Sequence, residues 1–388
     1  MKKKVLIIFK YPHGWNRDVI NKFSNYYDAE FLYVSNFENK NFVEIVKEIN
    51  DLISLKKIEI VVFDPDYFKF INYFFVQKIN CKKKILMTGD DFHLHELHSI
   101  TASECDMVLS SDPLSVLKYK EKGFDAFFFQ FDFSKIKKTG ENKKDIDVLF
   151  YGHITEDRKE ILNYISGEGI NLKNVGHEEF VTGLPRDELL ELISRSKIFL
   201  NLSKTRTSKV QKYNTDSIYK FYYQFKGKVI IAGLKGIACV SEYSPGLELL
   251  FNKDEVPTFY TKEECLEILK KLLKDEELLS GYTKNFTSKV QNLHEDKKNF
   301  ESIFNAIEKE SNRKVKLIKI PYWYLRIAAK QIILKNIKLS NLLKSLLQFK
   351  IIFPMLENSN VVEKILIILE SFINILWYSL IYSIKNKK

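Results

Sequence analysis

The chain has few of the residues that build disulfide-held or metal-held folds. Its 388 residues include four cysteines, Cys81, Cys105, Cys239 and Cys265, which lie far apart and form no CxxC pair. Small secreted domains and zinc ribbons depend on closely spaced cysteines, so both classes are excluded. The cysteine pattern therefore favours a protein of a reducing cytosol.

Long uncharged apolar runs are also missing. The apolar run in the N-terminal MKKKVLIIF ends at Lys10 and is shorter than the roughly 7 to 15 residues of a secretory signal, so we expect a buried strand there. The last apolar stretch, from Ile365, contains Glu370 and Asn374. Placing Glu370 in hydrocarbon would cost about 2.5 to 3.5 kcal/mol, so we expect a helix that lies in the membrane plane or inserts shallowly.

Arginine is scarce, and the positive charge is confined to one region. Only seven of the 61 basic residues are Arg, whereas nucleic-acid binders rely on Arg, so no nucleic-acid partner is expected. Residues 313–388 hold 14 basic and 3 acidic residues, a net +11, and residues 1–312 hold 47 of each. The entire net charge of the chain therefore comes from its last part.

This last part has the pattern of a basic amphipathic helix. Polar residues recur at helical spacing opposite apolar ones, which is typical of a helix on a membrane surface. Tyr322, Trp323 and Tyr324 suit the lipid headgroup level. The alternative is a helical bundle that packs on the body of the protein. The polar residues are Gln331, Lys335, Lys338, Asn341, Ser345 and Gln348.

Apolar β-rich runs alternate with helical patterns in two halves of the body, which predicts an α/β fold with two doubly wound Rossmann-like domains facing a cleft. We expect domains at 1–138 and 139–312 and a helical tail at 313–388, with the polar segment 135–145 as linker. The strand candidates are KVLIIF, EFLYVS, IEIVVF, KILMT, DMVLSS and DAFFFQ in the first half, and DVLFYG, INLKNVG, KIFLNLS, IACVS and VPTFY in the second.

Several features of the second half suit a phosphate-binding site. The segment 228–251 predicts a helix, a strand after Gly236, and a second helix at Ser244-Pro245-Gly246, where unpaired backbone N–H groups can bind an anion. A further helix begins after Gly152, with Thr155 as cap and Arg158 in its first turn. Lys204 and Arg206 follow another strand and could clamp a diphosphate; the alternative is an exposed basic loop.

These residues resemble the donor-sugar segment of GT-B glycosyltransferases, especially the CgeB-like and group 1 families. In that resemblance Lys228 starts the helix and Gly236 precedes the strand, "fyG...dR" matches Gly152 and Arg158, and "vvSE" matches Glu242. The resemblance implies a nucleotide-sugar substrate, no separate cofactor and no metal. The implied donor-binding residues are Gly152, Arg158, Lys204, Arg206, Lys228, Glu242, Ser244, Gly246 and Glu248.

The first half supplies the candidates for acceptor chemistry. Residues 84–134 resemble the corresponding family stretch, and Asp90 and Asp91 follow the strand KILMT, where a carboxylate could take a proton from an acceptor hydroxyl. The alternative is a helix cap without chemistry. His13, in the loop after the first strand, is a further candidate base. His93, His95 and His98 follow the pair Asp90 and Asp91, and Asp91 with His95, or His95 with His98, could share a helix face and bind a metal, but no second cluster of ligands supports a metal site.

The sequence departs from the group 1 pattern at one point. Retaining enzymes of that family carry an E-x7-E motif, and this chain has Tyr223 and Ile231 at the two positions. Glu242 and Glu248 could contact ribose or sugar instead. We predict a metal-independent glycosyltransferase on the cytosolic membrane face, acting on a lipid-linked or envelope glycan acceptor. The alternatives are a catalytically silent scaffold bound to anionic membrane and a sugar-nucleotide epimerase.

Overall fold

The computed structural model describes residues 2–12, 16–37, 40–65, 71–89, 91, 94–130, 143–176, 184–204, 223–294, 297–309, 320–334, 356 and 360–385. The chain divides into two compact units. Unit 1 comprises Met1–Ser110, Ser115–Phe131 and Phe304–Lys388, and unit 2 comprises Ser111–Leu114 and Asp132–Ile303. The sequence placed a boundary at residue 138 and a tail from residue 313, whereas this division groups the described tail helices with unit 1. The expected linker falls largely outside the described residues.

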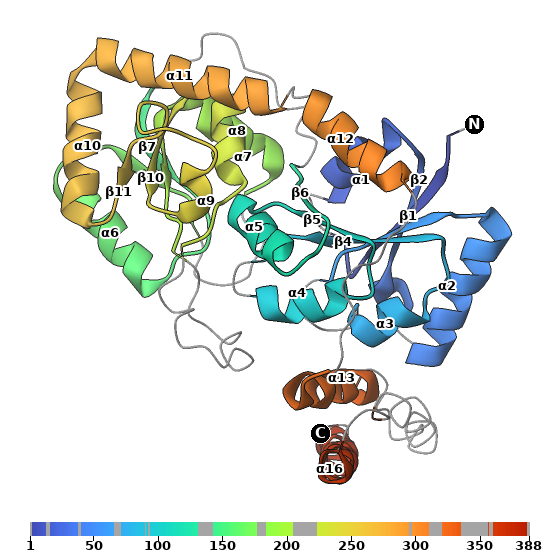
Figure 1. Cartoon of the computed structure of the whole chain (residues 1–388). Helices are drawn as coiled ribbons and strands as arrows, with labels where there is room; N and C mark the ends of the chain where they lie inside the picture. The colour runs from blue at the N-terminus through green and yellow to red at the C-terminus, as the bar shows by residue number, and fades with distance from the viewer. Residues whose placement is uncertain are drawn as a thin grey trace. The chain divides into compact units, whose positions relative to one another are not determined.

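Unit 1 is built on a six-stranded parallel sheet in the order β2-β1-β3-β4-β5-β6. Apolar residues fill both faces of its central strands, as a sheet covered by helices on two sides requires. Figure 1 shows α1 on one face and α2, α3 and α4 on the other. The strands are β1 (Lys4–Phe9), β2 (Asp28–Tyr33), β3 (Ile60–Phe63), β4 (Lys83–Thr88), β5 (Met107–Ser110) and β6 (Ala126–Phe128).

The helices of unit 1 begin with recognisable capping residues where the sequence supplies them. Asn41 caps α2 and exchanges bonds with Glu44 in a capping box, and Asn72 accepts two backbone N–H groups at the start of α3. The helices are α1 (Asn16–Ser24), the 3-10 turn η1 (Val34–Phe37), α2 (Phe42–Lys56), α3 (Tyr73–Lys78), α4 (His95–Ala102), α5 (Pro113–Glu121), α13 (Tyr322–Leu334) and α16 (Val361–Lys385).

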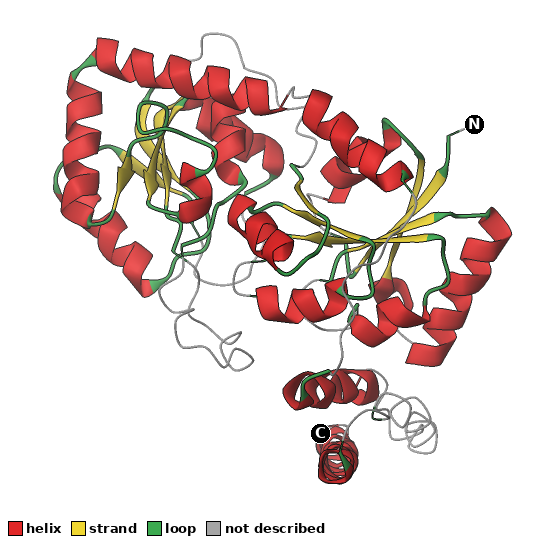
Figure 2. Cartoon of the chain, in the orientation of Figure 1, coloured by secondary structure: helices red, strands yellow, loops and turns green. Residues whose placement is uncertain are grey.

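Unit 2 repeats the plan with five parallel strands in the order β11-β10-β9-β7-β8, and Figure 2 shows helices around this sheet. From β7 the chain forms β8 on one side and β9 on the other, so the topological switch point lies beside β7. The strands are β7 (Ile146–Phe150), β8 (Leu172–Asn174), β9 (Ser196–Asn201), β10 (Ala238–Glu242) and β11 (Thr258–Phe259); the helices are α6 (Glu156–Gly167), α7 (Arg186–Arg195), α8 (Lys228–Leu234), α9 (Pro245–Glu248), α10 (Lys262–Lys274) and α11 (Glu276–His294).

All eleven strands expected from the sequence are present, and both sheets are parallel as predicted. One expected element is much shorter than anticipated. The helix predicted from Ser244-Pro245-Gly246 is the single turn α9, after which residues 249–250 form a turn. A four-residue helix cannot sum the peptide dipoles of a long one, so its start offers unpaired N–H groups but little macrodipole.

Helix α12 (Lys297–Glu308) ends on unit 1, where a lysine caps it. Lys83 Nζ donates to the carbonyl oxygens of Ala306, Ile307 and Lys309 at 2.9, 2.6 and 2.7 Å. Glu308 accepts from Lys3 and from the Tyr27 hydroxyl. Positive charge at a helix C-terminus satisfies carbonyls that lack an intrahelical partner, so β4 fixes the end of α12.

The described tail helices α13 and α16 pack against each other, and Arg326 of α13 forms an ion pair with Glu370 of α16. Tyr324 is fully buried: its hydroxyl accepts the backbone N–H of Tyr73 and lies 3.1 Å from Thr101 Oγ1. The expectation that Tyr324 lies at lipid headgroup level is therefore corrected. Its ring is part of the core of unit 1.

Helix α16 exposes one apolar face. Seven residues of its first half are between 46% and 70% exposed, and we call them the α16 apolar face: Val361, Val362, Ile365, Leu366, Leu369, Phe372 and Ile373. Within the described ranges, no helix has the length and apolar character needed to cross a membrane. The polar stripe predicted from Lys335 to Gln348 lies outside the described residues.

Candidate functional site

Three loops of unit 2 meet at one edge of its sheet. They follow β7, β9 and β10, three neighbouring parallel strands whose carboxyl ends point the same way. The switch point lies at this edge, where open α/β sheets bind their ligands. Most of the predicted donor-binding residues belong to these loops or to the helices that follow them.

Arg158 joins the first two of these loops. It lies in the first turn of α6, where Thr155 Oγ1 accepts its backbone N–H at 3.4 Å. Its guanidinium donates to the carbonyl oxygen of His153 after β7, at 2.7 Å, and to those of Leu202 and Lys204 after β9, at 3.0 and 2.8 Å. The residue is 8% exposed. Arg158 therefore holds two loops in fixed positions while it adds a positive charge beneath them.

Glu242 joins the β9 loop to β10. Its Oε2 atom accepts the backbone N–H groups of Ser203 and Lys204, each at 2.8 Å. Burial raises the pKa of Glu242, although these hydrogen bonds act in the opposite direction. The predicted sugar or ribose contact from Glu242 stays a prediction, because in this structure one carboxylate oxygen serves the loop.

Lys228 lies at the start of α8 and points at the β7 loop. Its Nζ donates to the carbonyl oxygen of Tyr151 at 2.9 Å and lies 5.1, 5.3 and 5.6 Å from the ring centres of Phe150, Tyr151 and Phe199. Burial, followed by the charges of Arg158 and Lys226, lowers the pKa of Lys228 well below its ordinary value.

Gly152 is needed at this point for two reasons. Its φ is +133°, a region that residues with a side chain rarely adopt, and a Cβ there would lie 3.3 Å from Lys228 Nζ. The lone glycine after β7 therefore lets the backbone pass directly beside the amino group. The sequence signal for this contact was the strand followed at once by Gly152.

The remaining residues predicted to bind the nucleotide-sugar differ in how far they are exposed. Ser244 precedes α9 with a buried hydroxyl that makes no hydrogen bond to the described residues, and a Cβ at Gly246 would lie 2.8 Å from Asp112 Oδ1. Lys204 forms an ion pair with Asp157. Glu248 is exposed. Arg206 lies outside the described residues, so its predicted role stays a prediction.

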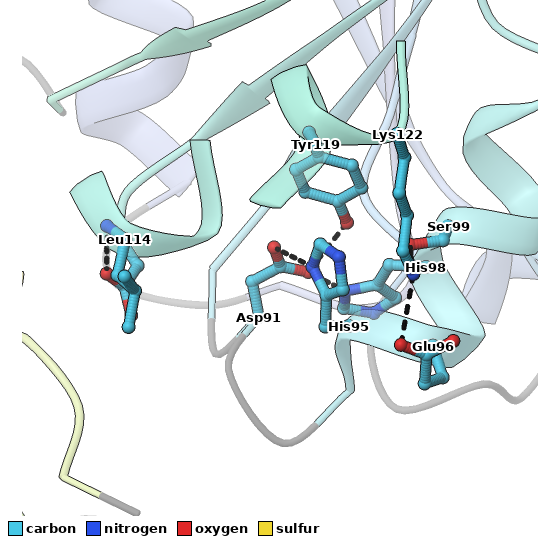
Figure 3. A network of polar contacts seen from close by, with 9 residues as sticks. Asp91, His95, Glu96, His98, Ser99, Leu114, Tyr119 and Lys122 are labelled. Atoms are coloured by element: carbon cyan, nitrogen blue, oxygen red, sulfur yellow. Dashed lines mark hydrogen bonds and ion pairs between the residues drawn. The ribbon is translucent and has the colours of Figure 1, made fainter. Parts of the chain in front are cut away.

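Unit 1 contains a buried polar cluster on α4 and α5. Asp91 Oδ1 accepts the Tyr119 hydroxyl at 2.9 Å and lies 2.6 Å from His98 Nδ1, as Figure 3 shows. His95 Nδ1 is 3.6 Å from Asp91 Oδ2, too far for a hydrogen bond, and its ring centre lies 4.4 Å from that of Tyr119. Burial raises the pKa of Asp91, but the two histidines outweigh it and hold this pKa well below its usual range.

The expectation that Asp91 faces an open edge and acts as a base is corrected by its burial. Asp91 is 0% exposed. Its carboxylate instead ties the loop after β4 to α4 and α5, and it acts as a positioning group. His98 was expected near Asp91 only as a possible metal ligand, and Tyr119 was missed as a partner. Asp90, His93 and His13 lie outside the described residues, so the base roles of His13 and Asp90 stay predictions.

Among the described side chains, no group of three or more His, Cys, Asp or Glu residues is arranged to hold a metal ion. The described groups at the edge of unit 2 are therefore backbone N–H groups, the buried Arg158, the amino group of Lys228 and the buried carboxylate of Glu242.

Comparison with known proteins finds one family model that matches the part of the chain containing this edge. Residues 139–305 match the family model described as glycosyl transferase-like. The match includes β7, β9 and β10, the loops that follow them, and every predicted donor-binding residue. No curated protein matches the chain.

Solved structures share the fold of the whole body at low identity. HepE of Anabaena, solved with UDP, has a TM-score of 0.52 at 9% identity over 79% of this chain and 99% of its own. Sucrose-phosphate synthase of Thermosynechococcus elongatus reaches 0.53 at 9% identity, covering 79% and 98%. A glycosyltransferase of Rickettsia africae also reaches 0.53 at 9%, covering 79% and 99%. These likenesses establish the GT-B fold.

Proposed function

We propose that the chain, whose residues 139–305 match the glycosyl transferase-like family model and whose body has the GT-B fold, moves a sugar from a nucleotide-sugar to a lipid-linked or cell-envelope glycan. The arrangement of side chains at the edge of unit 2 is the observation that supports the nucleotide-sugar donor. There Arg158, Lys228 and Glu242 hold three loops in place through hydrogen bonds to their backbone. Gly152, in the first of these loops, has no side chain to cover its backbone.

This edge suits a diphosphate for electrostatic reasons. The guanidinium charge of Arg158 lies beneath the loops, the amino group of Lys228 lies beside Gly152, and Lys204 lies three residues after the end of β9. The N–H groups at Ser244 and Gly246 add donors without a side chain. A phosphate pair beside Gly152 would meet positive charge at close range. The similarity to HepE, whose structure holds UDP, supports a nucleotide diphosphate as the donor's leaving group.

In this proposal, unit 1 binds the acceptor and supplies the base. The hydroxyl oxygen of the acceptor attacks the anomeric carbon, its proton passes to a base, and the nucleotide diphosphate leaves with the bonding electrons. His13 and Asp90 are the candidate bases. Asp91 keeps the β4 loop in place through Tyr119 and His98, and no metal takes part in the proposed step.

A location at the cytosolic membrane face is proposed from charge and exposure. Residues 313–388 carry the whole net charge of +11. The α16 apolar face offers side chains that a lipid surface could cover. Anionic lipid attracts each nearby Lys or Arg by about 1 kcal/mol, while apolar contact adds attachment that salt cannot screen. A membrane location would bring the enzyme to a lipid-linked acceptor.

The proposal is tested by a thermal-shift screen against UDP-, GDP-, dTDP- and CMP-sugars, followed by transfer of labelled sugar to extracted membrane lipids. We expect one nucleotide class to raise the melting temperature and the label to enter the lipid fraction. Binding without transfer to extracted lipids, or to a cell-envelope glycan fraction assayed in parallel, would contradict the proposed reaction and favour a silent scaffold. Conversion of the free donor sugar without an acceptor would favour an epimerase.

A further inference from the structure

The amino group of Lys228 occupies an unusual position for a lysine. Within the described residues its one hydrogen-bond acceptor is the Tyr151 carbonyl oxygen, and three aromatic rings lie around it at 5.1 to 5.6 Å. No carboxylate of the described residues forms an ion pair with it. An ammonium group has three N–H donors, and the described protein groups around this partly exposed residue satisfy one of them with a neutral acceptor. The three rings favour the ammonium form, but they supply no hydrogen-bond acceptor and no negative charge.

The ionisable groups around Lys228 also disfavour a second positive charge. Arg158 approaches from α6 and Lys226 from the segment before α8, and both lower the pKa of Lys228. Cys239 and Glu242 of β10 act in the opposite direction, but more weakly. The Cys239 thiol is itself protonated, because burial raises its pKa. Glu242 uses Oε2 for the backbone of Ser203 and Lys204.

We propose that Lys228 is uncharged in the donor-free enzyme and takes up one proton when a nucleotide diphosphate binds beside Gly152. The inference rests on the proposed function, because it assigns a charge state to the proposed donor site. The uncharged amine donates to Tyr151 and keeps the β7 loop closed on α8 without an ion pair. The ammonium then forms only when the phosphates supply the opposite charge.

The coupling follows from elementary electrostatics. A diphosphate brings two negative charges to the edge, and an opposite charge within about 4 to 6 Å favours the ionised form of a lysine. Linkage makes the effect reciprocal: if the donor raises the proton affinity of Lys228, protonation raises the affinity for the donor. Donor affinity is then constant below the pKa of Lys228 in the free enzyme and falls by up to tenfold per pH unit above it.

Calorimetric titration of the full chain with UDP, in two buffers of widely different ionisation enthalpy, measures this proton uptake. At about pH 8.5 a lysine of ordinary pKa is about 99% protonated and takes up about 0.01 proton, whereas a lysine whose pKa is lowered should take up a much larger fraction of a proton per UDP. The diphosphate of UDP is fully ionised at that pH and carries one more negative charge than the diphosphate of a nucleotide-sugar. Burial keeps the neighbouring Cys239 and Tyr151 protonated, so neither contributes.

Two lysine variants distinguish the source of the proton. Lys228→Met should abolish the uptake and weaken UDP binding. Lys226→Met, two residues away and bonded to Gln224, removes a charge that lowers the pKa of Lys228, so it should reduce the uptake without abolishing it. The pH profile of the wild-type affinity gives a second measurement that needs no variant. UDP binding with no proton uptake and no fall in affinity above neutral pH would overturn the inference and leave the proposed function intact. If UDP, GDP and dTDP all fail to bind, the proposed function fails and this inference fails with it.

Discussion

Arg158 and Lys228 were both expected to meet the donor phosphates, yet each is already engaged with backbone carbonyl oxygens. Arg158 reaches three carbonyls in two loops, and Lys228 reaches one. At the residue scale, the consequence is that these side chains shape the binding edge as well as charge it. A substitution at either position should therefore affect stability and donor affinity together.

Replacing Arg158 should show both effects. Hydrogen bonds from a charged group contribute about 1.5 to 3 kcal/mol each, so we expect Arg158→Ala to lower the free energy of unfolding by about 2 to 4 kcal/mol and donor affinity at least tenfold. Chemical denaturation and calorimetry measure the two. Lys159→Ala, one residue along α6, is the control. Unchanged stability and affinity in Arg158→Ala would remove this residue from the site.

Gly152 gives a second test of the same edge. Gly152→Ala places a side chain at φ +133° and 3.3 Å from Lys228 Nζ, so we expect a cost of about 1 to 3 kcal/mol in stability and displacement of the amino group. Gly167→Ala is a suitable control because a Cβ there meets no atom within 4 Å. Equal melting temperatures for the two variants would contradict the account of Gly152.

The buried His95 of unit 1 predicts a pH dependence of stability. Burial lowers the pKa of His95, so the unfolded chain binds a proton there more readily than the folded one. The contribution of neutral His95 to the free energy of unfolding is complete above the ordinary histidine pKa of about 6.5. It is lost as the pH falls from there toward the pKa of His95 in the folded protein. Urea denaturation at about pH 7.5 and pH 5 should show less loss for His95→Phe than for wild type. An identical loss in both proteins would contradict the buried, neutral His95.

The acceptor base remains a residue-scale prediction. At least one of His13 and Asp90 should be needed for transfer, because a general base contributes typically 10² to 10⁴ in rate. Turnover of His13→Ala and Asp90→Ala under saturating donor measures this, with calorimetry to verify that each variant still binds the donor. Near-normal turnover in both variants would place the base elsewhere.

At the scale of elements, local sequence patterns were sufficient to predict the strands, but they were insufficient to predict the contacts between side chains and loops that lie far apart in the sequence. Apolar runs such as KVLIIF predict buried strands because nearly every position is apolar. The burial of Asp91 was missed because it depends on Tyr119, which α5 brings from 28 residues away. The carbonyl contacts of Arg158 were missed for the same reason, since Leu202 and Lys204 come from a distant loop.

The end of α12 predicts a large effect from a single lysine. Lys83→Met removes three bonds to the last carbonyls of this helix, and we expect a loss of about 2 to 4 kcal/mol in the stability of unit 1. The neighbouring Lys82 is 74% exposed in its side chain, so Lys82→Met should change stability by less than about 0.5 kcal/mol. Equal denaturation midpoints for both variants would contradict the capping role of Lys83.

At the scale of the whole molecule, the net charge of +11 in residues 313–388 predicts that the protein attaches to an anionic membrane through this part. Because α13 buries Tyr324 in unit 1, truncation before residue 313 would open that core, and substitution on α16 is the cleaner test. We expect Leu366→Glu combined with Leu369→Glu to reduce sedimentation with anionic liposomes at high salt. Leu55→Glu, at an 81% exposed leucine of α2, should not. Equal sedimentation of all three proteins would contradict attachment through the α16 apolar face.

The central claim is that the donor binds at the edge of unit 2 formed by the loops after β7, β9 and β10. Amide hydrogen exchange with and without the nucleotide found in the screen tests it directly. The account predicts slower exchange at residues 151–158, 202–204 and 243–247 when the nucleotide is bound, with the amides of α4 in unit 1 unchanged. Protection confined to unit 1, or none at these three loops despite saturating nucleotide, would contradict it.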